Sequence, residues 1–383
     1  MARIAVIGAG VFGAWTAHHL QAQGHAVVLI DAFGPAHARA SSGGETRMIR
    51  AAYGKDRIYA RMAVESLPHW QALSATAGLP ILISHGVLYF FAGDDPCFED
   101  SLAIHRDLGL ASQALGPADL TRRFPMINFD GIDAGLFEPD FGTLLARRSV
   151  QTLVQQLVVG GGTYVQGAVL PPLDDSDRLT SVRLASGKSI EADGFAFAAG
   201  PWLPKLFPKH IGARIRPTRQ EIFYFAPPSG DRRFLPASMP GWADFNRGDM
   251  VYGFPDIEAR GVKFAHDRHG PLVDPDTQSR TPTEAALAEV IAFRDRRFPL
   301  LRGAPLIGAE VCQYENSSNG DFLIDRHPGH ANVVLVGGGS GHGFKHGPEV
   351  GRIAAMLAVS GGPQTEPRFT LATKATTQSR AVH

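Results

Sequence analysis

MARIAVIGAGVFGAWTAHHLQAQGHAVVLID, residues 1–31, has the pattern of a strand, a glycine-rich turn, a helix and a second strand. Arg3–Ile7 is a short apolar run that suits a buried strand, and Ala26–Ile30 is another. Between them, Val11–Gln23 carries alanines and a leucine at the spacing of a helix that faces a sheet. This order predicts a βαβ unit at the start of a parallel sheet.

Three glycines, Gly8, Gly10 and Gly13, complete G-x-G-x-x-G at the turn. In a dinucleotide-binding unit such glycines make the tight turn, admit the pyrophosphate and bring helix and strand together. The helix N-terminus offers N–H groups to the phosphates, and Asp31 can accept hydrogen bonds from ribose hydroxyls. The stretch therefore predicts dinucleotide binding, and the alternative is a glycine-rich turn in another parallel α/β protein. FAD and NAD both bind this way, so the choice stays open here. The expected contacts at this turn are Gly8, Gly10, Val11, Phe12 and Gly13.

The bulk composition is that of an ordinary soluble globular protein, with 383 residues, 44% hydrophobic and 19% charged. Lys+Arg and Asp+Glu both count 37, so no net charge favours nucleic acid or an anionic membrane. No stretch has membrane-spanning length, no signal peptide fits before the fingerprint, and SRAVH is no peroxisomal address. The cysteines, Cys97 and Cys312, suggest neither a disulfide scaffold nor a metal cluster. We expect a cytoplasmic monomer without a metal site.

Further along the chain, apolar periodicity predicts helices and strands in alternation. We expect helices at Tyr59–Leu73, Ala118–Phe124, Arg148–Val159, Thr281–Arg294 and Glu349–Val359. We expect strands at His85–Phe91, Thr163–Val165, the start of Phe195–Trp202, Gln220–Phe225, Met250–Phe254 and Asn332–Val336. Thr281 is the expected N-cap of its helix, with Pro282 in the first turn and Glu284 closing a capping box. Leu136–Thr143 is interpreted as a turn-rich connector, and the chain from Gly361 as a loosely held tail.

The order of these elements predicts an α/β protein with two discontinuous domains. A Rossmann-type domain takes residues 1–84, 145–210 and 320–383, and a mixed, largely antiparallel α+β substrate domain takes 85–144 and 211–319. The strand at the start of FAFAAGPW ends in small residues and a glycine, which suit backbone packed against a cofactor on the sheet edge. GGGSGHGFKHGPEVG is a second glycine loop that feeds a helix N-terminus.

The segment FGPAHARASSGGETRMIRAAYG, residues 33–54, is long for a connection inside a compact domain. Its small residues, Ser41 and Ser42 among them, would let the backbone lie against a flat ring. Arg47 and Arg50 could bind an anion bidentately. A solvated basic turn is the equally weighted alternative.

A series of longer motifs follows in order: GAGVFG, DAFGPAH, ETRMIRAAYG, MVYGFP, RGVKF, VCQYE, DFLIDRHPGHANV and GSGHGFKHG. Together they resemble the sarcosine oxidase family of FAD-dependent amine oxidases, which includes N-methyltryptophan oxidase and pipecolate oxidase. They cover both proposed domains and are far more specific than the glycine triplet. The resemblance implies FAD and a glutathione-reductase-like fold of the D-amino-acid-oxidase type.

The resemblance also implies a covalent flavin. The family cysteine at the position of Cys312 is joined to a methyl group of the flavin ring, and a thiolate can attack that activated methyl. From the residue alone, Cys312 would be a small buried hydrophobe. Cys97, among the acids of DDPCFED, should have a raised pKa and take no part. Further cofactor contacts implied are Asp31, Ser41, Ser42, Arg47, Val169, Gly200, Trp202, Gly341, Gly343 and Lys345.

The same comparison implies how a substrate is held. Arg50 and Lys345 match the family pair that grips the substrate carboxylate, a planar fork and a point charge. Lys263, in RGVKF, matches the lysine credited with activating dioxygen, where a cation stabilises the superoxide first formed. Without the match, each of these cations would be interpreted as a surface residue.

His342 matches a family histidine near the flavin, and Tyr252 an aromatic at the edge of the substrate cavity. A structural hydrogen-bond donor and plain core are the respective alternatives. Sarcosine oxidase has a histidine four residues after the catalytic lysine, but this chain has Asp267 there, beside His266. A carboxylate could pair with a cationic or hydroxylated substrate or bind a cyclic amine. Sarcosine itself is therefore in question, while the reaction type is not.

The resemblance therefore implies an FAD-dependent oxidase of a secondary or N-substituted (N-methyl or cyclic) amino acid. Hydride transfer to the flavin would give an imine, and reoxidation by dioxygen would give hydrogen peroxide. The nearest alternative is a flavin dehydrogenase of the same fold that passes electrons to another acceptor. An NAD-dependent dehydrogenase and a non-catalytic nucleotide-binding module are the remaining ones.

Overall fold

A six-stranded sheet in the order β18-β19-β12-β1-β2-β9 forms one half of the molecule. The computed structural model describes residues 1–173, 176–246, 249–360, 362 and 366–379. Five strands run parallel and β18 pairs antiparallel with β19. The strands are β1 (Arg3–Ile7), β2 (Ala26–Asp31), β9 (Thr163–Gln166), β12 (Gly194–Phe197), β18 (Leu323–Arg326) and β19 (Val333–Gly337). The predicted Rossmann-type βαβ unit is confirmed.

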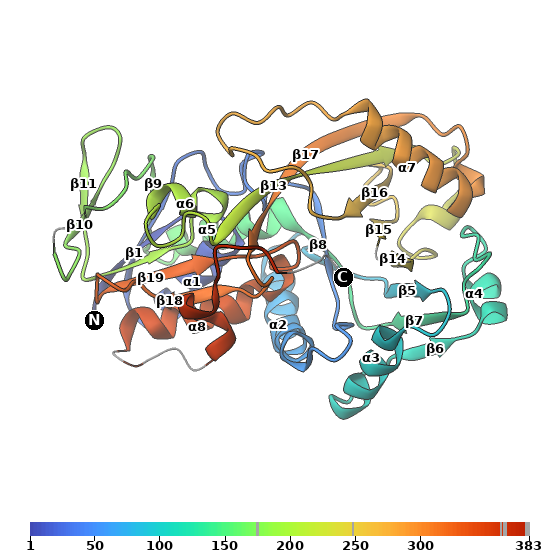
Figure 1. Cartoon of the computed structure of the whole chain (residues 1–383), viewed down its shortest axis with the longest axis horizontal. Helices are drawn as coiled ribbons and strands as arrows, with labels where there is room; N and C mark the ends of the chain where they lie inside the picture. The colour runs from blue at the N-terminus through green and yellow to red at the C-terminus, as the bar shows by residue number, and fades with distance from the viewer. Residues whose placement is uncertain (174–175, 247–248, 361, 363–365, 380–383) are drawn as a thin grey trace.

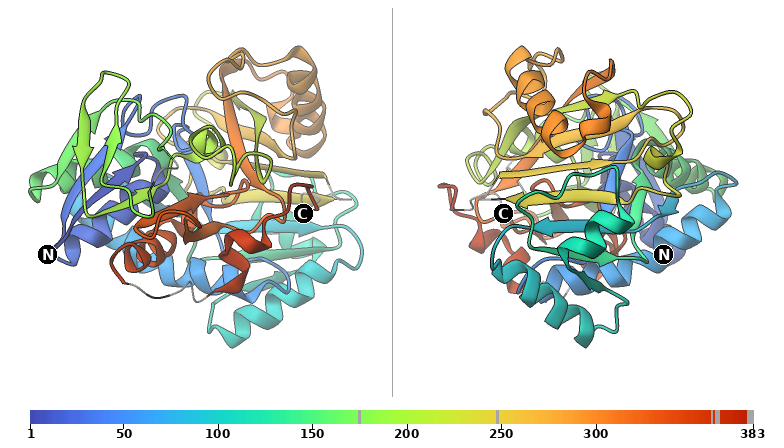
Figure 2. Two further views of the ribbon diagram at one scale, coloured as in Figure 1. Left: turned by 60° about the vertical axis from the view of Figure 1, so that its left-hand side comes forward. Right: turned by 90° about the vertical axis from the view of Figure 1, so that its right-hand side faces the viewer.

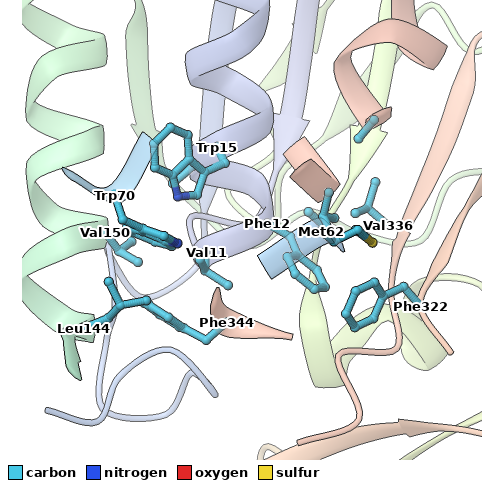
Figure 3. Close-up of a cluster of buried hydrophobic side chains, with 14 of the residues drawn as sticks. Val11, Phe12, Trp15, Met62, Trp70, Leu144, Val150, Phe322, Val336 and Phe344 are labelled. Carbon is cyan, nitrogen blue, oxygen red and sulfur yellow. The ribbon is translucent and has the colours of Figure 1, made fainter. Parts of the chain in front are cut away.

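Helices cover this sheet and bury a large aromatic core. They are α1 (Val11–Ala22), α2 (Arg57–Thr76), α5 (Ala146–Val159) and α8 (Gly347–Val359). Figure 3 shows Trp15 of α1 next to Trp70 of α2, whose ring centroids are 5.2 Å apart, and Trp70 stacks on Phe344 at 5.6 Å. A Cβ at Gly351 of α8 would lie 2.6 Å from Trp15. The glycine therefore allows α1 and α8 to pack closely.

The second half is an eight-stranded sheet in the order β17-β13-β16-β15-β14-β5-β7-β6. Only the β14–β5 pair among these is parallel, so the expected largely antiparallel sheet is confirmed. The strands are β5 (Val87–Phe91), β6 (Gln113–Leu115), β7 (Ala134–Glu138), β13 (Ile215–Phe225), β14 (Gly241–Asn246), β15 (Asp249–Phe254), β16 (Val262–Asp267) and β17 (Leu306–Ser317).

The helices of this half are α3 (Pro96–Asp107), α4 (Pro117–Arg123) and α7 (Glu284–Arg297). Figure 1 shows the two sheets side by side, and Figure 2 shows α7 (orange) and α3 (cyan) on opposite sides of the second half. Trp242 of β14 is fully buried and stacks on Phe293 of α7, with ring centroids 5.8 Å apart. One apolar cluster lies within this half, whereas another contains residues of both sheets, Val6 of β1 and Tyr89 of β5 among them. We propose that the domain division follows the two sheets.

A small sheet in the order β3-β8-β4 joins the segment after β2 to this framework. Its strands are β3 (Thr46–Ile49), β4 (Leu82–Ser84) and β8 (Gly142–Leu145). The segment 33–54 is therefore no solvated turn, because β3 pairs with β8 and places Arg47 opposite Leu144. A separate hairpin, β10 (Ser181–Arg183) with β11 (Ser189–Glu191), lies at the other end of the molecule.

The interpretation of Leu136–Thr143 as a connector is wrong. The stretch contains most of β7 and the start of β8, and only the residues between them turn. The proline and glycine suggested a loop, but Leu136 is fully buried and Glu138 is 1% exposed, so tertiary packing holds both strands. Helix α3 was not expected from the sequence either, although Asp95 caps it by accepting a hydrogen bond from the Cys97 N–H.

The expected N-cap of the helix at Thr281 is two residues too early. Thr283 is the N-cap of α7, and its side chain accepts a hydrogen bond from the Ala286 N–H. The backbone N–H and hydroxyl of Thr283 also donate to Glu221 of β13. This anchor to the sheet fixes the start of the helix, and Glu284 becomes its first residue.

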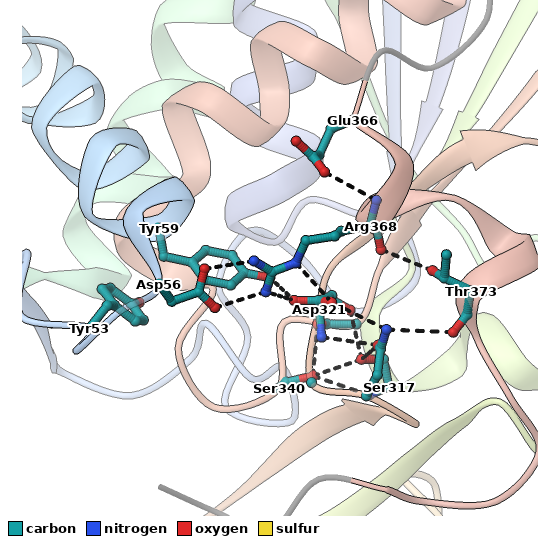
Figure 4. Close-up of polar contacts among 12 residues, drawn as sticks. Tyr53, Asp56, Tyr59, Ser317, Asp321, Ser340, Glu366, Arg368 and Thr373 are labelled. Atoms are coloured by element: carbon teal, nitrogen blue, oxygen red, sulfur yellow. Dashed lines mark hydrogen bonds and ion pairs between the residues drawn. The ribbon is translucent and has the colours of Figure 1, made fainter. Parts of the chain in front are cut away.

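The C-terminal segment, where it is described, is not loosely held. Figure 4 shows Arg368 between Asp56, which precedes α2, and Asp321, which precedes β18. The Tyr59 hydroxyl also donates to Asp321 at 2.7 Å, and Phe369 is 1% exposed. Residues 361, 363–365 and 380–383 of the predicted tail lie outside the described residues.

The helices of the described ranges include none that is both long and apolar enough to cross a bilayer.

Candidate functional site

A cavity of about 380 Å³ opens at the carboxyl ends of β1, β2 and β12. This is where doubly wound sheets bind nucleotides. The loops before β3 and before α8 close its far side. Three of the predicted cofactor contacts, Gly13, Cys312 and Lys345, do not line this cavity. The others line it: Gly8, Gly10, Val11, Phe12, Asp31, Ser41, Ser42, Arg47, Val169, Gly200, Trp202, Gly341 and Gly343.

The glycine turn is built for close backbone contact. Gly8 has φ +106°, and a Cβ there would lie 2.2 Å from the Ala198 carbonyl oxygen. A Cβ at Gly13 would lie 1.8 Å from the Gly8 carbonyl oxygen. Gly13 therefore acts from behind the turn by letting α1 approach β1, which explains why it does not line the cavity.

Asp31 is held firmly at the end of β2. Its carboxylate accepts hydrogen bonds from the backbone N–H of Ala9 at 2.7 Å and from those of Phe33 and Gly34 at 2.8 Å. Ser42 accepts a hydrogen bond from the Val11 N–H at 3.1 Å, beside the N-terminus of α1. The loop after β2 is therefore fastened to the phosphate end of the cavity.

Glu315 provides a test of whether the cavity suits a flavin dinucleotide. One carboxylate oxygen accepts from the Gly339 N–H at 3.3 Å, and Oε2 is buried without a hydrogen-bond partner among the described residues. Burial raises the pKa of Glu315 to about 7. A lone buried acceptor on a cavity wall calls for a donor, and the polyhydroxyl chain of FAD supplies several. The residues present therefore fit FAD.

Cys312 lies behind the same wall, on β17, and is 8% exposed. Its sulfur is 3.7 Å from the Arg47 Nη2 and 3.7 Å from the Ser41 carbonyl oxygen, two residues that line the cavity. Cys97 is half-buried, and its pKa is raised as predicted, although burial contributes more than Asp95 and Asp100 do.

Arg50 and Lys345 are brought together by the fold. They are 7% and 3% exposed, and both contact the ring of Tyr53. The distances to its centroid are 4.1 Å from the Arg50 Cζ and 4.9 Å from the Lys345 Nζ. Arg50 donates to the Ala52 carbonyl, and Lys345 to the His342 carbonyl at 2.9 Å. Two buried cations close together are costly without an anion, so the pair suits a carboxylate ligand.

Glu138 lies behind this pair. It accepts a hydrogen bond from the Ala51 N–H at 2.9 Å and is 3.5 Å from the His105 Nε2. Burial raises its pKa to about 7, against the opposing effects of the Ala51 N–H and Arg50. Glu138 is therefore a weak counter-ion, and its charge depends on pH near neutrality.

Lys263 is 1% exposed on β16. Its Nζ donates to the Thr46 carbonyl at 3.1 Å and lies 5.0 Å from the ring centroid of Phe254. Burial, and then the charge of Arg47, lower its pKa to about 7. The predicted dioxygen-activating lysine is thus a buried amine next to the Arg47 end of the cavity rather than a surface residue.

The other predicted residues lie around these. The pKa of Tyr252 is raised to about 12, by burial first and by Asp267 next, so the two side chains share one environment. His342 is flanked by cavity-lining Gly341 and Gly343, but its ring hydrogen-bonds to Tyr53 and to the Gly320 carbonyl. His342 therefore makes the structural hydrogen bonds that its alternative interpretation implied. The direct roles expected of Tyr252, His342 and Asp267 stay predictions.

Sequence reasoning missed Tyr53, Glu138 and Glu315. Glu315 stands inside the motif VCQYE, three residues after Cys312, and its alternation with Gln313 along a strand could have drawn attention to it. Glu138 was hidden by the connector interpretation. Tyr53 is next to last in the motif ETRMIRAAYG, whose arginines carry the stronger chemical signal.

Comparison with known proteins gives a consistent result. The family model described as FAD dependent oxidoreductase matches residues 3–357. Monomeric sarcosine oxidase from Bacillus sp. (strain B-0618) is 30% identical over 94% of this chain and 92% of its own. N-methyl-L-tryptophan oxidase from Citrobacter koseri is 30% identical over 94% of this chain and 95% of its own. The L-proline dehydrogenase of P. horikoshii superposes with a TM-score of 0.83 at 20% identity, covering 97% and 96% of the two chains. That structural likeness shows the fold alone.

Proposed function

Because the chain belongs to the FAD dependent oxidoreductase family, we propose that it is an oxidase of a secondary or N-substituted amino acid. The observation that carries the proposal is the buried cation pair, Arg50 and Lys345, beside a cavity suited to FAD. The names of relatives such as sarcosine oxidase and N-methyl-L-tryptophan oxidase support the same class of substrate, an N-methyl or cyclic amino acid.

The residues that would hold FAD extend along the cavity. The turn at Gly8 and Gly10, with Asp31, would hold the ADP half, and Glu315 would accept a hydrogen bond from the connecting chain. Cys312 would tether the ring through a thioether. Bound there, FAD supplies the acceptor for a hydride from the substrate and the means of passing two electrons to dioxygen.

Arg50 and Lys345 would fix the substrate by its carboxylate. A bidentate guanidinium and a point charge together determine the direction in which the amine end extends. Their charges also disfavour an ammonium nearby and lower the pKa of the bound amine. The amine then keeps the lone pair that the departing hydride requires.

Lys263 would act in the oxygen half of the reaction. Its Nζ is fixed by the Thr46 carbonyl, so a proton held there gives a positive charge at one place in a dry site. Such a charge stabilises the superoxide that forms first. This role favours an oxidase over the alternative, a dehydrogenase that delivers electrons to another acceptor.

A panel of paired compounds tests the substrate class. Each N-methyl or cyclic amino acid is mixed anaerobically with the purified protein, and the flavin absorbance is followed. A parallel reaction uses the amine that the same compound would give on decarboxylation. We expect the amino acids to bleach the flavin at least about a hundredfold faster, because each amine lacks the group that the cations bind. Hydrogen peroxide should form when air is admitted.

Equal rates for an amino acid and its amine would contradict the proposed role of the cation pair. Bleaching that is not reversed by air, with no peroxide, would assign the dehydrogenase alternative.

A further inference from the structure

Tyr53 connects the two segments that carry the cation pair. It follows Arg50 by three residues in the segment after β3, while its hydroxyl reaches His342 and His346, which flank Lys345. Its ring contacts both cations, at 4.1 Å from the Arg50 Cζ and 4.9 Å from the Lys345 Nζ.

The hydrogen bonds of the Tyr53 hydroxyl have a defined direction. The Gly320 carbonyl can only accept, so the His342 Nε2 carries the hydrogen in the 3.1 Å contact between them. In the neutral ring the His342 Nδ1 is then the acceptor, and Tyr53 donates to it at 3.0 Å. The hydroxyl oxygen then accepts from the His346 Nε2 at 2.8 Å. His346 is fully buried, and burial together with Lys345 and Arg50 keeps its pKa well below the ordinary value.

This arrangement fixes the plane of the ring. A phenol with its proton and a lone pair both engaged cannot rotate without breaking two hydrogen bonds in a buried site. The negative face of the ring attracts both cations, which would otherwise repel each other. The backbone at Lys345 is held too, because the Trp70 Nε1 donates to its carbonyl at 2.8 Å. Tyr53 is therefore the fixed side chain on which the spacing of the two cations depends.

We propose that Tyr53 is a positioning residue that sets the spacing of Arg50 and Lys345, and thereby the strength and direction of their grip on a carboxylate. The inference rests on the proposed function, since it concerns the same cation pair. Tyr53 acts through those cations and through the histidines that hold it.

The test measures carboxylate binding separately from turnover. Acetate is titrated into the resting enzyme, and its dissociation constant is read from the perturbation of the flavin spectrum. Tyr53→Phe keeps the ring but frees its plane, so we expect acetate to bind about tenfold more weakly, the loss of one to two net hydrogen bonds. Tyr53→Leu also removes the aromatic face, and we expect about a hundredfold. KM for the amino acid should rise in parallel, while the slow bleaching by the decarboxylated amine stays unchanged.

Tyr89→Phe is the matched control. Tyr89 is fully buried, its ring centroid is 5.9 Å from the Arg50 Cζ, and its hydroxyl contacts only the Met48 sulfur among the hydrogen bonds described. Removing this hydroxyl should change acetate binding less than about twofold.

Wild-type affinity for acetate in Tyr53→Phe, or an equal loss in Tyr89→Phe, would overturn the inference. Failure of the wild-type enzyme itself to bind acetate or to distinguish amino acids from amines would instead overturn the proposed function. Because Tyr53→Phe is isosteric, its folding can be checked by its melting temperature, and it decides the matter even where Tyr53→Leu does not fold.

Discussion

Glu138 is a residue beside the cation pair whose charge changes near neutral pH. It is buried behind Arg50 and hydrogen-bonded to the Ala51 N–H, and its pKa is about 7. Below that pH the group is neutral, and the charges of Arg50 and Lys345 are available to a ligand. Above it, the carboxylate offsets part of those charges. The burial also has a stability consequence, because the pKa in the folded state exceeds that of the unfolded chain. The stabilising contribution is complete below about pH 4.5 and is lost as the pH rises through about 7.

Glu138→Gln should therefore remove a pH dependence. In the wild type we expect acetate binding to weaken about three- to tenfold between pH 6 and pH 8 as Glu138 ionises. The variant should match the wild type at pH 6 and bind more tightly than it at pH 8. Its melting temperature at pH 8 should also exceed that of the wild type. The measurement is the acetate dissociation constant across this range, with Glu191→Gln, an exposed position, as control.

The same decline in both proteins between pH 6 and pH 8 would show that another group, not Glu138, controls the charge of the cation pair.

Whether a site residue could be predicted from the sequence depends on whether a local motif or a contact between distant segments gives it its role. Motifs led to Arg50, Lys345, Lys263 and Cys312, and the fold buries all four, although none of them lines the cavity. Glu138 and Tyr53 escaped because their importance lies in contacts between segments far apart in the chain. His342 was expected near the flavin, but its ring is engaged by Tyr53 and Gly320.

At the scale of elements, the β1–turn–α1 unit depends on glycines, which have no Cβ atom. Gly13 leaves room for the Gly8 carbonyl, which a Cβ would meet at 1.8 Å. Backbone cannot move out of the way as a flexible side chain can, so any larger residue must push α1 away from β1.

Gly13→Ala should consequently lose both stability and cofactor. We expect a loss of about 3 kcal/mol in the free energy of unfolding and most of the bound flavin, because the N–H groups at the start of α1 move from the phosphates. Flavin absorbance per protein and a urea unfolding curve measure the two effects. Gly24→Ala is the control, since its φ is +84° but nothing lies within 4 Å of the added Cβ. It should cost about 1 kcal/mol and retain the flavin. Full flavin content in Gly13→Ala would contradict the assignment of this turn.

Elements with a strong local signal were predictable, and those fixed by distant partners were not. The glycine turn and the apolar run of β1 are determined by their own residues. By contrast, β3 and β8 exist because they pair with each other, from residues almost a hundred apart. Thr283 rather than Thr281 starts α7 because Glu221 of β13 holds it. Such choices depend on neighbours that the local sequence does not show.

At the scale of the whole molecule, the two sheets meet along the cofactor cavity. The parallel sheet supplies the glycine turn and Asp31, and the antiparallel sheet supplies Glu315 from β17. Lys263, on β16, lies in the same antiparallel sheet. The described C-terminal segment fastens this arrangement, since Arg368 joins the start of α2 to the loop after β17. A flavin in this cavity would lie between the half that binds its phosphates and the half that carries the reactive groups.

The central claim is that this cavity holds FAD and that Cys312 tethers it beside the cation pair. The most direct test is the mass of the peptide that contains Cys312, released by proteolysis from freshly purified enzyme under denaturing conditions. The account predicts a peptide heavier by the mass of FAD less two hydrogens, which leave the thiol and the flavin methyl group, and Cys312→Ser should release its flavin on acid precipitation. An unmodified Cys312 peptide from protein that holds FAD would contradict the tether, and a protein that neither contains nor takes up FAD would contradict the whole account.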